Sequence, residues 1–204
     1  FHVLKDRLHL VAAVDIDQAA AQRVATYCPQ AKTAKDYGEV LDEVDAVLIA
    51  LPHHLHHEVA LACLRAGKHV LLEKPMANSE RQCLDLIEES ERSHTTLMVA
   101  YCMRYHPLVM GLKAALDQRV CGEIFQLSIW TEQLTQRPAS SWVSRAATLG
   151  GGQLFSHGCH YIDLLLWFLG LPLSGTHMGT KRGTPWMERE GTSNVSLLFA
   201  EGRL

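Results

Sequence analysis

The sequence lacks three features, and each absence excludes a class of protein. It has no run of about 18 consecutive apolar residues, the length of a membrane-spanning helix; the longest candidate, 164–173, falls short. It has no surplus of positive charge, since 19 Lys and Arg stand against 22 Asp and Glu, so we expect neither nucleic acid nor a membrane as a partner. It also has no C-x-x-C pair, because its six cysteines are scattered.

Cysteine usage indicates the cellular compartment. Several of the six cysteines sit inside apolar runs, where a free thiol behaves as a small hydrophobic group. Scattered thiols without a disulfide framework are typical of a reducing environment, so we expect a cytoplasmic protein.

What is present is the composition of an ordinary globular protein. The 204 residues are 48% hydrophobic and 20% charged, enough for one large domain or two small ones. Apolar runs and periodicity predict strands at 8–14, 45–51, 69–72 and 96–101, with a first helix at 18–27. Strands that alternate with helices in this way predict an α/β fold, a doubly wound parallel sheet with helices on both faces.

The later helices of this region have recognisable ends. The second helix is predicted to bury one face, consisting of Leu55, Val59, Ala62 and Ala66. It is predicted to stop at Gly67. The third opens at Ser79-x-x-Gln82, which predicts a capping box, and it is predicted to end near Arg92.

The pattern changes after Arg104, and an α+β domain with a large open sheet is predicted there. Its predicted elements are a helix at 107–118, a strand at 123–130, a polar stretch at 131–147, a long helix at 151–169 and strands at 175–180 and 192–200. The last strand leads into a hairpin turn at Glu201-Gly202. We therefore divide the chain into an α/β domain at 1–103 and an α+β domain at 104–204.

Asp15 stands at the end of the first predicted strand. In dinucleotide-binding folds this place holds a carboxylate that accepts both hydroxyls of the adenosine ribose. A carboxylate there repels a 2′-phosphate, and residues 16–18 offer no cation, so the position favours NAD over NADP. The alternative is that Asp15 caps the following helix.

Two turns at predicted strand ends carry the strongest local signals. One is Leu51-Pro52-His53-His54-Leu55-His56-His57 and the other is Glu73-Lys74-Pro75. Ligands bind at the carboxyl ends of strands in open parallel sheets, and a lysine buried there can bond to a substrate oxygen or move a proton. The four histidines suggest zinc, but no Cys or carboxylate lies at a suitable spacing, so no metal is predicted.

These turns resemble those of the glucose–fructose oxidoreductase, inositol dehydrogenase and rhizopine-catabolism (Gfo/Idh/MocA) family. Segment 45–90 is similar to the family's Thr-Pro-Asn-x-x-His turn followed by Glu-Lys-Pro, with His53 in place of asparagine. By the same resemblance, the Lys74–Pro75 peptide bond is predicted to be cis, a minority state at about 5–6% of X–Pro bonds.

The resemblance continues in order through the second half. Arg104-Tyr105-His106-Pro107 resembles the Arg-x-x-Pro segment that enters the family's second domain, and Gly122-Glu123-Ile124 resembles its Gly-x-Ile. Gly150-Gly151-Gly152, with His160 and Asp163, resembles its glycine-triplet helix. The combination is far more specific than any single motif.

For the fold, the resemblance implies a Rossmann-type domain and an α+β domain whose sheet faces the nicotinamide. It also implies that residues 1–2 come just after the glycine fingerprint, so that the first strand and phosphate loop precede this sequence and the rest of the second sheet follows it. A whole enzyme of two such domains should be longer by roughly 100 to 150 residues.

The resemblance implies roles for particular residues as well. Those assigned to NAD, with Asp15, are Leu51, Pro52, His53, His56, Glu73, Lys74, Pro75 and Arg104. Those assigned to the substrate are Lys74, Arg145, His157, His160 and Asp163. Those assigned to catalysis are Lys74, His160 and Ser156.

The catalytic helix departs from the family at one position. The family's pattern is similar to Asp-x-x-x-His, and Ser156 here replaces the carboxylate four residues before His160. Serine can bond to a substrate hydroxyl but cannot accept a proton at neutral pH. We therefore assign proton transfer to His160 with Lys74, helped by His157.

Helical spacing also predicts how this helix packs. One polar-edged face is predicted to consist of Ser156, His160, Asp163 and Trp167. A broad buried stripe is predicted to consist of Leu154, Tyr161, Ile162, Leu165 and Leu169.

The predicted function is reversible hydride transfer between nicotinamide and a sugar, polyol or related cyclic alcohol, by a homo-oligomer formed through the C-terminal sheet. Three alternatives stay open. The family has relatives that use a tightly held NAD for glycoside cleavage, and others that resemble regulators sensing a dinucleotide without turnover. The third alternative is a metal-binding domain built on the histidine cluster.

Overall fold

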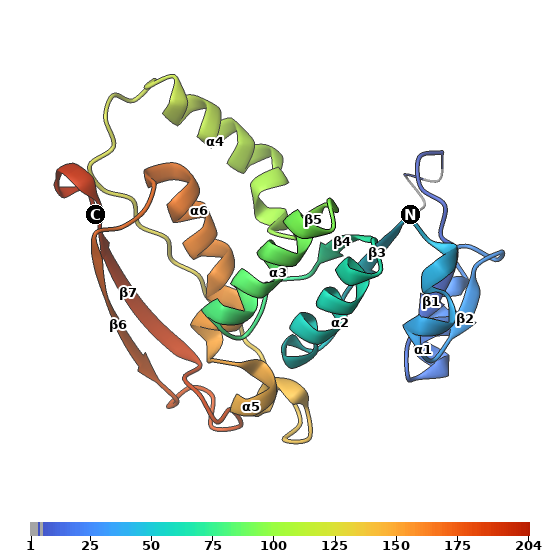
Figure 1. The fold of residues 1–204 in the computed structure, drawn as a ribbon. Helices are drawn as coiled ribbons and strands as arrows, with labels where there is room; N and C mark the ends of the chain where they lie inside the picture. The colour runs from blue at the N-terminus through green and yellow to red at the C-terminus, as the bar shows by residue number, and fades with distance from the viewer. Residues whose placement is uncertain (1–3, 5) are drawn as a thin grey trace.

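The structure, a computed structural model, describes residues 4 and 6–204, and the expectation for residues 1–2 lies outside them. Its elements form three groups (Figure 1). A small βαβ unit stands beside a parallel sheet covered by two helices, and a long helix with an antiparallel hairpin follows at the other side.

The βαβ unit contains two parallel strands and one helix: β1 (Ala12–Val14), α1 (Gln18–Ala25) and β2 (Lys32–Ala34). Helix α1 begins where the Asp17 carboxylate accepts a hydrogen bond from the amide of Ala19. Strand β1 is shorter than the predicted strand at 8–14. Strand β2 was not predicted, because three residues that include a lysine form no apolar run.

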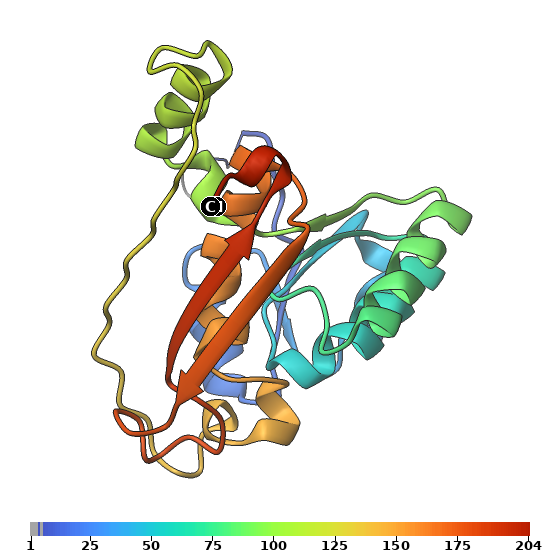
Figure 2. The same ribbon diagram turned by 90° about the vertical axis from the view of Figure 1, so that its left-hand side faces the viewer.

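The central sheet consists of parallel strands in the order β3 (Ala46–Ile49), β4 (His69–Leu72) and β5 (Leu97–Val99). Helices α2 (His53–Arg65) and α3 (Glu80–Arg92) pack against each other and against one face of this sheet (Figure 2). The pair β2-β1 and the sheet β3-β4-β5 correspond to positions 3-2 and 4-5-6 of the doubly wound order 3-2-1-4-5-6. The predicted Rossmann-type fold class is confirmed.

The core of this half lies between the sheet and its two helices. Its most buried members are Ile49, Ala60, Cys63, Leu64, Val70, Leu72 and Leu86. On the opposite face of the sheet, Leu48, Leu71 and Met98 are 56%, 37% and 41% exposed. Helices on both faces were expected, but among the described residues they cover only one face of these three strands.

The buried face of α2 differs from the prediction, which named Leu55, Val59, Ala62 and Ala66. Its buried members are His53, His56, Ala60, Cys63 and Leu64. Apolar periodicity missed this face because histidine counts as polar, yet both histidines find backbone carbonyl partners in the core. Gly67 ends the helix in the left-handed conformation, with φ of 73°, as predicted.

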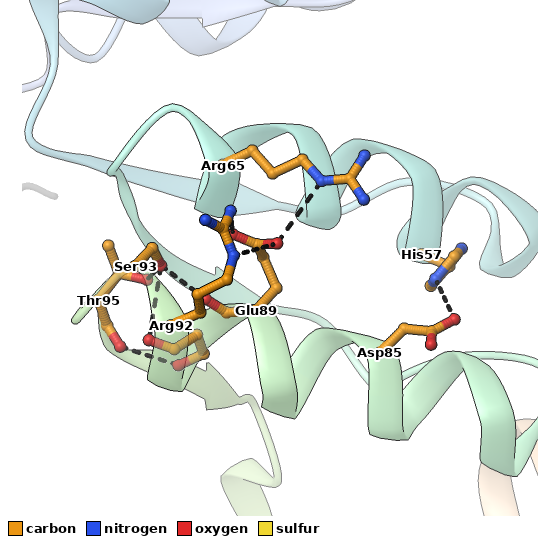
Figure 3. A network of polar contacts seen from close by, with 8 residues as sticks. His57, Arg65, Asp85, Glu89, Arg92, Ser93 and Thr95 are labelled. Atoms are coloured by element: carbon orange, nitrogen blue, oxygen red, sulfur yellow. Dashed lines mark hydrogen bonds and ion pairs between the residues drawn. The ribbon is translucent and has the colours of Figure 1, made fainter.

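Contacts between polar and charged side chains also hold α2 and α3 together (Figure 3). The Glu89 side chain is only 8% exposed; it bonds to Arg92 at 2.5 Å and lies 3.6 Å from Arg65. Farther along, His57 Nε2 lies 3.4 Å from Asp85. Two guanidinium groups compensate the loss of water around the Glu89 carboxylate, so this charge can stay buried between the helices.

The start of α3 differs in detail from the predicted capping box. The Ser79 hydroxyl accepts a hydrogen bond from the Gln82 amide at 3.3 Å, which is half of that motif. The Gln82 side chain, however, accepts from the amide of Asn78 instead of that of Ser79. The helix ends at Arg92, as predicted.

The second half begins with α4 (Pro107–Asp117), as predicted. Residues 123–130 were predicted as a strand, and they run extended without joining a sheet in the described chain. Two of their backbone groups bond to Leu204. The Leu127 amide donates to the Leu204 carbonyl at 2.8 Å, and the Leu204 amide donates to the Phe125 carbonyl at 3.0 Å. A sequence typical of a strand does not make one by itself, because a strand also needs a partner for its backbone groups.

The remaining elements are α5 (Ala146–Leu149), α6 (Cys159–Leu169), β6 (Ser174–Thr180) and β7 (Thr192–Leu198). Strands β6 and β7 pair antiparallel, close to the two predicted strands, and Glu201 and Gly202 both adopt positive φ in the predicted turn. The predicted long helix is present, but a π-helical turn at Leu154–Gly158 precedes α6. In residues 4 and 6–204, no helix is long and apolar enough to cross a membrane.

The sheet generates a stability prediction for two neighbouring leucines. Leu72 is 0% exposed and Leu71 is 37% exposed on the opposite face of β4. We expect Leu72→Ala to lower the free energy of unfolding by about 2 to 5 kcal/mol, because it leaves a cavity in a packed core. Leu71→Ala, the matched control, should cost clearly less. Urea unfolding of the full-length protein measures both, and equal losses would contradict the assigned core.

Candidate functional site

A cavity of about 430 Å³ lies where the ends of β3 and β4 meet the helical segment before α6. Its wall includes the polar or ionisable residues His53, Glu73, Lys74, Gln133, Thr135, Arg137, Gln153, Ser156 and His157. Leu51 and Trp142 add apolar surface. A small polar ligand can therefore be held by several donors and acceptors and by an aromatic face.

Lys74 is the residue that joins both halves of the chain at this cavity. Its Nζ donates a hydrogen bond of 2.7 Å to the backbone carbonyl of Ser156, 82 residues away. That carbonyl belongs to the π-helical turn, where the usual i to i+4 backbone pattern is interrupted. The Lys74–Pro75 peptide bond is cis, as predicted.

The glycine triplet explains how the chain comes this close to the first half. Gly150 has φ of 88° and ends α5 in the left-handed region. A Cβ there would collide with the side chain of Asn78, and a Cβ at Gly152 would collide with Glu190. Glycine is therefore required at both positions for the helix to begin where it does.

Two histidines follow one another at the side of the cavity near Lys74. His157 lines the cavity, and burial, followed by the positive charge of Lys74, lowers its pKa. His160 lies behind it, with 6.0 Å between ring centroids, and is 8% exposed; burial and then Lys74 lower its pKa too. The Nδ1 of His160 is buried without a hydrogen-bond partner among the described residues. Both rings are thus neutral bases at pH 7.

His53 and His56 are held in fixed orientations by backbone carbonyls. His53 Nδ1 lies 2.9 Å from the carbonyl of Leu149, and burial lowers the His53 pKa to about 4. His56 is fully buried, with Nδ1 2.8 Å from the Pro75 carbonyl and Nε2 2.8 Å from that of Leu51. His56 therefore links the two turns that end β3 and β4, behind the cavity wall.

Arg104 and Asp163 form a bidentate ion pair beside this site. Arg104 Nε and Nη2 donate to the two Asp163 oxygens at 2.7 and 2.6 Å, and this bond raises the Arg104 pKa. The guanidinium also lies 5.3 Å from the ring centroid of Trp167. Two parallel hydrogen bonds and a ring face fix α6 to the segment that leaves β5.

The packing of α6 corrects the predicted faces. His160 and Asp163, predicted on a polar-edged face, are buried, since Arg104 compensates the charge of Asp163. Tyr161, Ile162 and Leu165, predicted in the buried stripe, instead line a second cavity of about 940 Å³. That cavity lies between α6, residues 126–134 and β7.

Asp15 follows β1 directly and does not cap α1, because Asp17 does. Its carboxylate accepts a hydrogen bond of 2.8 Å from the Asp17 amide and stays partly exposed. Residues 16–18 place no cation beside it. The position therefore fits a ribose with free hydroxyls better than one that carries a phosphate.

The structure brings only part of the predicted site together. Of the predicted residues, those in the wall of the 430 Å³ cavity are Leu51, His53, Glu73, Lys74, Ser156 and His157. Those outside its wall are Asp15, Pro52, His56, Pro75, Arg104, Arg145, His160 and Asp163. No group of three possible metal ligands occurs in the described part of the chain.

Sequence reasoning missed several residues of the cavity wall. They are Gln133, Thr135, Arg137, Trp142 and Gln153. All except Gln153 lie in the polar stretch at 131–147, from which only Arg145 had been assigned to the site. Its one usable signal was a tryptophan and an arginine in an otherwise unpatterned loop, which is the kind of segment that carries binding residues.

Comparison with known proteins identifies the family of the chain. Residues 1–101 match the model of the oxidoreductase family with an NAD-binding Rossmann fold, and residues 109–204 match the Gfo/Idh/MocA C-terminal domain. The chain belongs to this family.

Its relatives in the Gfo/Idh/MocA family include an inositol 2-dehydrogenase of Saccharopolyspora erythraea. It is 35% identical over 164 residues, which are 78% of this chain and 46% of that protein. The WlbA dehydrogenase of Chromobacterium violaceum, solved with NADH and UDP-GlcNAcA, is 27% identical, with a TM-score of 0.86 over 98% of this chain and 59% of that one. GenD2 from gentamicin A biosynthesis, solved with NAD, is 26% identical, with a TM-score of 0.86 over 98% and 58%. The chain thus spans about half the length of the curated relatives it matches.

The buried ion pair generates a prediction for α6. We expect Asp163→Asn to lower the free energy of unfolding by about 1 to 3 kcal/mol, because the hydrogen bonds to Arg104 lose their charge in a mostly buried place. Glu123→Gln breaks a pair with Arg119 whose side chains are 78% and 74% exposed, and should cost about 0.5 kcal/mol or less. Thermal unfolding of the two full-length variants tests the contrast. Similar losses would mean that the Arg104 pair does not anchor the helix.

Proposed function

We propose that this chain carries the cofactor-binding and substrate-contacting parts of an NAD-dependent oxidoreductase that acts on a sugar, polyol or related cyclic alcohol. The observation that carries the proposal is the convergence of Lys74, Ser156 and His157 on one cavity at the ends of parallel strands. Ligands bind at this edge in doubly wound sheets. A lysine, a hydroxyl group and a neutral base in one wall are suited to alcohol oxidation.

NAD is the cofactor that the residues fit. Asp15 would hold the adenosine ribose, and the turns around Leu51 and Glu73 would flank the nicotinamide end. When bound, the nicotinamide would supply the acceptor or donor of hydride. Structures of the relatives WlbA and GenD2 with NADH and NAD support the same assignment.

The chain's own residues would orient the alcohol and take its proton. Lys74 uses one N–H for the Ser156 carbonyl and has two others for a substrate oxygen. Ser156 also lines the cavity, and its hydroxyl would bond to a second substrate hydroxyl. The neutral imidazoles of His157 and His160 beside Lys74 provide the proton acceptor that the serine cannot be.

The substrate class follows from the wall and from the relatives together. Arg137, Gln133 and Thr135 offer polar groups, and Trp142 offers a flat apolar face of the kind that packs against a ring. Relatives are named as dehydrogenases of inositol and of levoglucosan. We infer a ring-shaped polyhydroxy compound.

The wider organisation belongs to the same proposal. We propose a domain boundary between residues 103 and 104, where α/β alternation gives way to the segment that leads into α4. We further propose a homo-oligomer formed through the C-terminal sheet, working in the cytoplasm. The six free cysteines support a reducing compartment.

A panel of sugars and polyols tests the activity. With the full-length protein and NAD, at least one member should yield NADH, and Lys74→Met should reduce kcat by about 10² to 10⁴, the usual effect of one acid–base group. NADH absorbance measures both. Lys113→Met is the matched control, since Lys113 lies on α4 and pairs with Asp117.

Other outcomes point to other functions. If NAD is bound but no member of the panel reduces it, the dehydrogenase is contradicted. Release of a free sugar from a glycoside would then indicate the glycosidase alternative. Ligand binding without any turnover would indicate a dinucleotide-sensing regulator.

Cofactor choice gives a second prediction. The wild-type full-length protein should bind NADH more tightly than NADPH, because the Asp15 carboxylate repels a 2′-phosphate. Asp15→Ala should narrow that gap, and Asp17→Ala, at the neighbouring helix cap, should leave the ratio of affinities unchanged. Fluorescence titration of the three proteins with NADH and with NADPH gives the six dissociation constants. Equal affinities in the wild type would remove Asp15 from the cofactor site.

A further inference from the structure

We propose that His53 presents its Nε2 as a hydrogen-bond acceptor to the ligand in the 430 Å³ cavity. The ligand group that meets it must be a donor, either the carboxamide of the cofactor or a hydroxyl of the substrate. This inference rests on the proposed function and deepens it, since it assigns one atom and the direction of its bond.

The tautomer of His53 follows from its contact with Leu149. Its Nδ1 lies 2.9 Å from the Leu149 carbonyl oxygen, which can only accept a hydrogen bond. Nδ1 must therefore carry the hydrogen. In a neutral imidazole, the other nitrogen then has a bare lone pair and cannot donate.

The ring is neutral under ordinary conditions. His53 is 4% exposed, and burial lowers its pKa to about 4, with smaller contributions from His56, Lys74 and His54. The bond to Leu149 favours the charged form but does not outweigh burial. Between pH 5 and 8 the Nε2 lone pair is thus available.

The His53 ring is also held rigidly by its neighbours, and its Nε2 has no hydrogen-bond partner among the described residues. Trp142 packs edge-on against it at 4.8 Å between centroids, and Phe155 lies at 6.2 Å. The His53 ring makes one hydrogen bond to another residue of the described chain, the one through Nδ1, and Nε2 is not among the buried unpaired atoms. His56 differs, since both of its nitrogens contact carbonyls. The Nε2 of His53, as a fixed acceptor in the cavity wall, therefore favours ligands that place a hydrogen-bond donor opposite it.

Two substitutions distinguish a ligand-binding role of His53 Nε2 from a purely structural role of the His53 side chain. In His53→Asn the amide can still donate to the Leu149 carbonyl near the Nδ1 position, but nothing reaches the Nε2 position. In His53→Gln the amide reaches the Nε2 position and loses the Leu149 contact. His54→Asn is the matched control, because His54 is the exposed neighbour on the same helix.

We expect His53→Asn to weaken binding of one ligand by about tenfold, the value of one hydrogen bond, and to lower Tm less than His53→Gln does, because it keeps the Leu149 contact. His53→Gln should keep affinity within about threefold but lower Tm, and His54→Asn should change neither. Titration of the full-length protein with NADH, then of its NADH complex with the polyol, identifies which ligand supplies the donor.

The tautomer itself has an independent readout. Nitrogen NMR of the full-length protein at pH 7 should show His53 as a neutral ring protonated on Nδ1. A hydrogen on Nε2, or wild-type affinity of His53→Asn for both ligands, would overturn the inference alone. Failure of the wild type to bind either ligand would overturn it together with the proposed function.

Discussion

The hydrogen bond from Lys74 Nζ to the Ser156 carbonyl is the contact on which the site depends. It connects the turn after β4 to the π-helical turn before α6, and so closes the cavity from both halves of the chain. Because the acceptor is a backbone oxygen, the lysine keeps this partner whatever side chain residue 156 has. A change of the side chain at position 156 therefore leaves this partner of Lys74 in place.

Two further contacts stabilise this arrangement. The His53 ring contacts the Leu149 carbonyl in the second half of the chain, and Arg104, where the second half begins, pairs with Asp163 on α6. In each contact, a polar group with little access to water has a hydrogen-bond partner. A site built from such contacts can be both polar and rigid. Burial also keeps the imidazoles near Lys74 neutral, so the same packing that fixes the geometry prepares the bases.

Much of the fold was predictable because it rests on local patterns. The run at 45–51 and the strand at 69–72 are apolar over the length of a strand, and Gly67 marks a helix end that only glycine adopts cheaply. Strand β2 and the buried face of α2 were not predictable in this way. A strand of three residues is too short to show a periodic pattern of apolar residues. His53 and His56 are buried because their rings contact backbone carbonyls of residues farther along the chain.

The sequence by itself determined the order of the elements, the family, and the residue types at the strand ends, because each depends on short spacings along the chain. Only the tertiary structure decided which of those residues share a cavity. It placed His157 in the wall with His160 behind it, and it added Trp142 and Arg137 from a stretch without pattern. These residues come from segments that are far apart in the chain. Packing and hydrogen bonds to backbone carbonyls bring them together, and a local sequence pattern does not show such contacts.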